Sequence, residues 1–82
     1  MADKTLEFNP LRMKAERIAH GYRQDRVAEE MGISRGRYIR IEKGETPIGS
    51  DDLAVFANVI GVTDMRIFFT SNVDDLERNQ AS

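Results

Sequence analysis

The chain has no cysteine and no tryptophan, and only two of its 82 residues are proline. Without cysteine, neither a disulfide nor a thiolate zinc site can stabilise the fold, so a chain of this length depends on one modest core or on association. No apolar run approaches the ~20 residues of a membrane-spanning helix. The first residues, MADKTLEF, also lack the apolar stretch of a secretory signal. We therefore expect a single soluble domain in the cytoplasm.

No group of residues in the sequence is typical of a catalytic or cofactor site. The single histidine, His20, has no acid or nucleophile placed to suggest catalysis, and no metal-ligand cluster or glycine-rich phosphate loop is evident. The acidic pairs Asp51-Asp52 and Asp74-Asp75 are typical of helix starts, where carboxylates stabilise the positive end of the helix. We expect no enzymatic activity, no metal and no cofactor.

Positive and negative charges are divided along the chain. The formal net charge is −2, but residues 12–43 hold nine Lys/Arg and five Asp/Glu, a balance of +4. Residues 44–82 hold two Lys/Arg and seven Asp/Glu, a balance of −5. Affinity for a polyanion depends on the potential of the contacting face and not on net charge. The acidic total therefore does not exclude DNA as a partner.

The apolar spacing predicts an all-α protein of five helices around one core, with no alternating β pattern. We expect these helices at about residues 10–20, 24–31, 35–43 and 50–60, with a short fifth helix that opens at Thr63-Asp64 and carries Met65, Ile67, Phe68 and Phe69. A flexible arm is expected over residues 1–8 and a polar acidic tail over residues 70–82, which leaves residues 9–69 as the domain.

The first helix has a clear start signal. Asn9 is a suitable N-cap residue, and Pro10 suits the first helical position. Apolar residues then recur at helical spacing, and we expect them to face the core: Leu11, Ala15, Ile18 and Ala19.

Residues 23–44, RQDRVAEEMGISRGRYIRIEKG, indicate two short helices joined by a tight turn. Gly32 falls at the turn, and Ser34 can cap the next helix by accepting a hydrogen bond from a free backbone N–H. The second helix carries four cations and no acid at its outward positions: Arg35, Arg37, Arg40 and Lys43. A cationic helix held against a supporting helix is the geometry that enters a DNA major groove.

These residues resemble the helix-turn-helix family of phage repressors and Cro proteins over roughly residues 9–69. The matching positions are Arg17, Gln24, Ala28, Gly32, Ser34, Ile41-Glu42-x-Gly44 and the run Leu53, Ala57, Ile60-Gly61-Val62. The resemblance implies a lambda-repressor-like domain in which the second and third helices form the DNA-binding unit.

The resemblance also implies a role for each residue of that unit. Gln24 would bind a phosphate, helped by the helix N-terminus, and Arg23 could add a charged phosphate contact. Arg35, Gly36 and Arg40 would occupy base-reading positions. The complete set of implied DNA-binding residues is Arg23, Gln24, Ser34, Arg35, Gly36, Arg37, Arg40 and Lys43. Arginine recognises guanine through O6 and N7, so we expect G·C pairs under the reading arginines.

Three features depart from the family pattern. Gly36 has no side chain where relatives often place a polar one, and Ile39 lies near the outward sector of its helix. The loop after Gly44 offers Glu45 and Thr46 where several relatives carry a cation, which weakens the expected grip on the DNA backbone there.

Two structural features are expected beyond the DNA-binding unit. In the resembling fold, Arg17 and Glu42 form an ion pair that links the first helix to the end of the third. The apolar residues after the fourth helix are too many for a short helix to turn inward, and an exposed patch of that kind usually marks an interface. The expected homodimer contact comprises Val62, Met65, Phe68 and Phe69, and of the two adjacent phenylalanines we expect one to face the core and the other the partner.

The leading hypothesis is a bacterial or phage-encoded transcription regulator, a repressor that binds a two-fold DNA operator as a homodimer. One alternative is an antitoxin that binds a toxin partner and regulates its own promoter. A second is a controller protein that activates a neighbouring gene, and an anti-repressor is a further possible protein partner.

Overall fold

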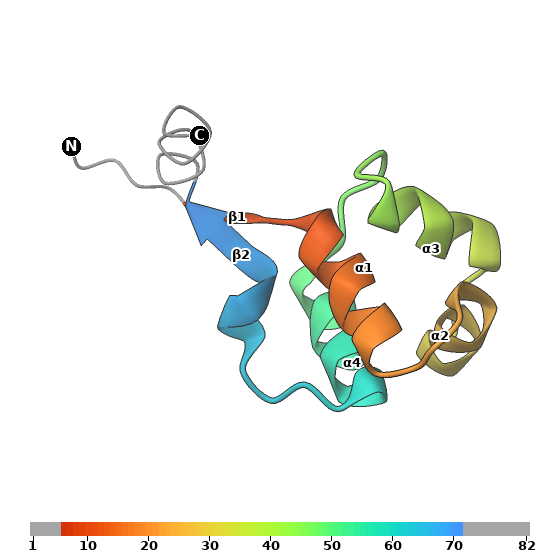
Figure 1. The fold of residues 1–82 in the computed structure, drawn as a ribbon. Helices are drawn as coiled ribbons and strands as arrows, with labels where there is room; N and C mark the ends of the chain where they lie inside the picture. Colours follow the sequence, from red (N-terminus) through yellow and green to blue (C-terminus); the bar gives the residue numbers. More distant parts are fainter. Residues whose placement is uncertain (1–5, 72–82) are drawn as a thin grey trace.

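The computed structural model describes residues 6–71 (Figure 1). The chain forms, in order, β1 (Leu6–Phe8), α1 (Pro10–Ala19), α2 (Gln24–Met31), α3 (Arg35–Glu42), α4 (Ser50–Ile60), the 3₁₀ helix η1 (Met65–Phe68) and β2 (Phe69–Ser71). Within this range, the longest helix has 11 residues, and none is long and apolar enough to cross a membrane.

Local sequence signals define most of the helix ends. The Asn9 side chain accepts a hydrogen bond from the backbone N of Leu11 at 3.0 Å, and Ser34 Oγ accepts one from the backbone N of Arg37 at 3.0 Å. These bonds satisfy backbone donors that a helix start leaves free. Gly32 ends α2 in the left-handed conformation with φ 76°, which glycine adopts without steric cost. The turn between α2 and α3 is thus specified by Gly32 and Ser34.

One hydrophobic core joins all four α-helices and η1. Its fully or nearly fully buried members are Met13, Val27, Ala28, Tyr38, Ile41, Leu53, Phe56, Ala57, Ile60 and Phe68. Phe56 of α4 lies between two other rings, with centroid distances of 6.2 Å to Tyr38 and 5.6 Å to Phe68. The core therefore fixes α3 against α4 and draws η1 onto the same centre.

The inward face of α1 differs from the predicted one. Leu11 and Ile18 are 71% and 57% exposed, whereas Met13 is fully buried and Arg17 is 8% exposed. Ala15 and Ala19 are exposed as well. The prediction that the apolar residues face the core was wrong, because Met13 and Arg17, four residues apart, form the buried side of the helix. A buried arginine requires a partner from elsewhere in the fold, which helical periodicity does not reveal.

The predicted helical architecture is confirmed, but the count of five helices without strands is not. Four α-helices are present in the described range, the fifth segment is a 3₁₀ helix, and β1 pairs antiparallel with β2 (Figure 1). The register places Leu6 opposite Ser71 and Phe8 opposite Phe69. The Phe8 and Phe69 rings meet edge to face at 6.2 Å. Strands of three residues are too short to show an alternating pattern, and their pairing joins opposite ends of the chain.

The predicted boundaries of the domain therefore change. The last three residues of the expected arm, residues 6–8, belong to the sheet, and so do the first two residues of the expected tail, residues 70–71. Residues 1–5 and 72–82, the remainder of the expected arm and tail, lie outside the described residues. The domain extends at least from Leu6 to Ser71.

Candidate nucleic-acid interface

The outer side of α3 forms the most cationic part of the predicted DNA-binding unit. Helices α2 and α3 pack against each other, and the backbone N of Ile33 binds the carbonyl of Ala28 at 3.0 Å across the turn. Tyr38, Ile41 and Glu42 are the buried residues of α3. At about 100° per residue, Gly36, Arg40 and Lys43 then point away from the core.

Three cations, on α3 and at its C-cap residue, Lys43, remain available to a partner. Arg35, Arg40 and Lys43 are exposed, and none of them forms an ion pair with a carboxylate of the described residues. Ser34 is also exposed, although its oxygen serves as the cap of the helix. Within the described residues, the exposed side of α3 thus presents three positive charges that no ion pair holds.

Gly36 lies directly beside Arg40. A Cβ placed on Gly36 would lie 3.5 Å from Nη1 of Arg40, which is ordinary van der Waals contact. The guanidinium of Arg40 therefore extends back along the helix toward its N-terminus, over the position that has no side chain. The glycine that departs from the family pattern leaves room for this arginine.

Two other predicted contact residues are engaged by nearby carboxylates. Arg37 Nη2 lies 3.0 Å from Asp52 Oδ2, and Arg23 Nε lies 3.2 Å from Asp25 Oδ1. Hydrogen bonding to Arg23 is the main reason that the pKa of Asp25 lies below its usual value. Both arginines remain substantially exposed, so these contacts are open to competition from a nucleic-acid phosphate.

Gln24 begins α2, but its side chain faces inward. Its Nε2 donates to Glu42 Oε1 at 3.0 Å, and the residue is half-buried. The predicted phosphate contact through this amide therefore competes with a contact inside the protein. The arrangement connects the start of α2 to the end of α3.

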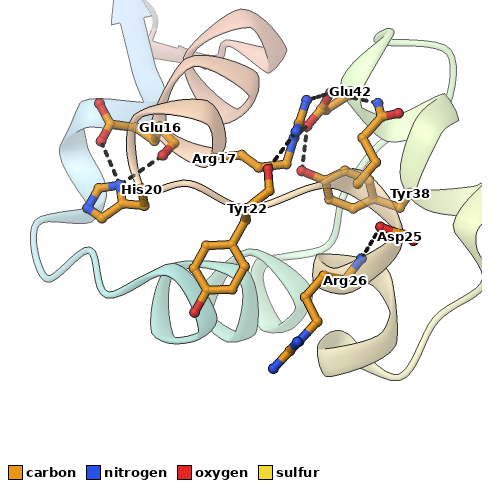
Figure 2. A network of polar contacts seen from close by, with 9 residues as sticks. Glu16, Arg17, His20, Tyr22, Asp25, Arg26, Tyr38 and Glu42 are labelled. Atoms are coloured by element: carbon orange, nitrogen blue, oxygen red, sulfur yellow. Dashed lines mark hydrogen bonds and ion pairs between the residues drawn. The ribbon is translucent and has the colours of Figure 1, made fainter.

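A buried polar network lies on the core side of α3 (Figure 2). Arg17 Nε donates to Glu42 Oε2 at 2.6 Å, and its Nη2 reaches Oε1 at 3.3 Å. Tyr38 also donates its hydroxyl to Oε2, at 2.5 Å. Arg17 Nη1 donates to the backbone carbonyl of Tyr22 at 2.8 Å. The pair implied by the resemblance thus lies within a larger network that joins α1, α2 and α3.

The surroundings of Glu42 favour its ionised form. Burial alone would raise the pKa of this carboxyl, but hydrogen bonds from Arg17, Tyr38 and Gln24 together hold it below its usual value. Burial and the bond to the Glu42 carboxylate raise the pKa of the Tyr38 phenol well above its ordinary value. The network therefore contains a charged pair and a neutral phenol at neutral pH.

The sequence reading missed the polar role of Tyr38 and the acidic partners of the exposed arginines. Tyr38 and Glu42 stand four residues apart on one helix, a spacing that brings side chains together and could have revealed their contact. No comparable local signal links Arg37 to Asp52, which lies on α4. That contact depends on how two helices pack.

The predicted dimer residues differ in exposure. Phe68 is fully buried in the core, so its placement in a dimer contact was wrong. Val62, Met65 and Phe69 are half-buried and pack against the core with part of their surface exposed. Phe68 turned inward because a single turn of 3₁₀ helix presents one of the two adjacent rings to Phe56.

The turn between α2 and α3 and the cationic outer side of α3 define a DNA-binding helix-turn-helix protein. A helix-turn-helix family model matches residues 13–66. The chain therefore belongs to this family, as its resemblance to repressor and Cro-type regulators implies. Comparisons with curated proteins and with solved structures give no match.

Proposed function

We propose that this protein is a transcriptional repressor that binds a two-fold symmetric DNA operator as a homodimer, with α3 in the major groove. The observation that carries the proposal is the exposed side of α3, where Arg35, Arg40 and Lys43 form no ion pair with a carboxylate of the described residues. The major groove of DNA admits an α-helix, and a guanidinium on that helix that no ion pair holds can contact base edges as well as phosphates.

Within this proposal, Arg35 and Arg40 read bases and the other cations hold the backbone. Arg35 is the first residue of α3, and Arg40 extends over the space beside Gly36. Each can bond guanine O6 and N7 together, a contact worth about 1–3 kcal/mol of discrimination. We therefore expect G·C pairs at the two positions that these arginines reach.

The homodimer rests on a row of apolar residues along the outer side of α4. Val55 and Val59 lie four residues apart on one side of α4, and Val62 follows the Gly61 cap at its C-terminal end. Val55 is 42% exposed, and Val59 and Val62 pack only partly against the core. Met65 and Phe69 are likewise only partly buried against the core, and we infer that a second copy covers these apolar side chains.

Selection of bound sequences from random duplex DNA tests the proposal. The wild-type protein should enrich two inverted half-sites with G·C pairs at fixed positions, centred about 34 Å apart on one side of the duplex. Enrichment of a single site without symmetry would contradict the homodimer. Failure to retain any DNA at low salt would contradict DNA binding itself.

A further inference from the structure

Two acidic residues occupy the first turn of α4, but only one of them contacts the DNA-binding unit. Asp52 lies 3.0 Å from the guanidinium of Arg37, with side-chain exposures of 33% and 44%. Asp51 is exposed and forms no ion pair within the described part of the chain. The two residues therefore carry the same charge on the same turn and differ in their access to α3.

The position of Arg37 explains why Asp52 can reach it. On α3, Arg37 lies about 60° around the helix from Arg40, on the shoulder next to the outward sector. The contact with Asp52 shows that this shoulder faces the start of α4. If α3 enters the groove by its outward sector, a phosphate beside the helix would approach Arg37 from the open side of that shoulder.

We propose that Asp52 sets the DNA affinity of this protein by occupying Arg37 in the free state. The inference rests on the proposed DNA-binding function. A carboxylate and a phosphate diester both present anionic oxygens to a guanidinium, so Asp52 holds Arg37 as a phosphate would and must release it when DNA binds. The Asp52 carboxylate is then left near the DNA backbone, where its charge repels phosphate.

The other cations of α3 are not controlled in this way. Arg35, Arg40 and Lys43 form no ion pair with a carboxylate of residues 6–71, so Asp52 acts on one contact out of four. Because Arg37 is expected to contact a phosphate, the effect of Asp52 applies to all DNA sequences equally. Asp52 thereby lowers affinity without altering sequence preference, and so limits binding to unrelated DNA.

The test compares Asp52→Asn with the matched control Asp51→Asn. Both changes remove one negative charge from the same helical turn, and both weaken the favourable interaction with the helix N-terminus to a similar extent. Binding of the full-length variants to a mixed-sequence duplex of about 30 base pairs is measured by fluorescence anisotropy between about 50 and 200 mM salt. Circular dichroism confirms that each variant is folded.

Asp52→Asn should bind about three to ten times more tightly than Asp51→Asn at the lowest salt, and its salt dependence should steepen by up to about 0.9 in log K against log salt. In an Arg37→Ala background the two changes should have equal effects.

Equal effects in the wild-type background would overturn the proposal, because they would show a general charge effect. Weaker binding by Asp52→Asn would also overturn it, because Asp52 would then be orienting Arg37 toward the phosphate. If no variant bound DNA at any salt concentration, the proposed function would fail, and this inference with it.

Discussion

At the scale of single residues, the cations of α3 divide into groups with separable effects on binding. Changing Arg35 or Arg40 to alanine should remove about 1–3 kcal/mol of discrimination at one base position each, because one bidentate guanine contact is lost. Lys43→Ala should instead weaken binding to every sequence and reduce the salt dependence. Titration of each variant with selected and scrambled duplexes measures both quantities. An unchanged sequence preference in the Arg35/Arg40 double variant would show that α3 does not read bases.

Gly36 offers a second test at the same scale. Gly36→Ala should stabilise the fold by up to about 1 kcal/mol, because alanine is the better helix former. The new Cβ meets Arg40 Nη1 at 3.5 Å, a contact that needs no rearrangement. Urea unfolding measures the gain in stability. A larger side chain at this position, as in Gly36→Gln, should displace Arg40 and alter the base preference at the position that it reads.

At the scale of helices and their contacts, the network around Glu42 holds three helices together. Arg17→Met or Glu42→Gln alone should destabilise the protein by about 3 kcal/mol, because each change leaves a buried charged or polar partner unmatched. The double variant should lose less than the sum of the two single losses. A double-mutant cycle on urea unfolding measures this coupling. Strict additivity would show that the two groups do not stabilise each other.

The same network predicts how stability depends on pH. Because the pKa of Glu42 is lower in the folded protein than in the unfolded chain, its contribution is fully present above the unfolded value of about 4.3. That contribution is lost as the pH falls through the folded pKa. Unfolding free energies between about pH 2 and 6 should therefore decline less steeply in Glu42→Gln than in the wild type. Parallel curves would contradict a depressed pKa at this carboxyl.

Local signals in the sequence sufficed for the helices and their caps, but not for contacts between elements. Asn9, Gly32 and Ser34 act within one or two turns of their own positions, and the structure shows their roles as predicted. The inward face of α1 was misread because Arg17 is buried by a partner 25 residues away. The competition of Asp52 for Arg37 likewise depends on the packing of α4 beside α3.

At the scale of the whole molecule, a charge introduced on the partly exposed side of the segment after α4 should have a different effect from a charge introduced on its buried side. Val62→Asp should give a folded monomer with greatly reduced operator affinity, because Val62 is half-buried at the proposed dimer contact. Phe68→Asp should instead prevent folding, because this side chain is fully buried against Phe56. Sedimentation velocity at micromolar concentration and circular dichroism separate the two outcomes. A wild-type chain that stays monomeric with operator DNA would rule out the homodimer.

The small sheet determines where the chain enters and leaves the domain. Leu6 lies opposite Ser71, so the two ends of the described range meet at one corner, which Figure 1 shows on the far side of the molecule from α2 and α3. A fluorescent protein or affinity tag fused directly before Leu6 or directly after Ser71 would start from this corner, away from the proposed DNA contact. The adjacent ends also suit insertion of the whole domain into an exposed loop of a host protein, which would deliver the host to the operator.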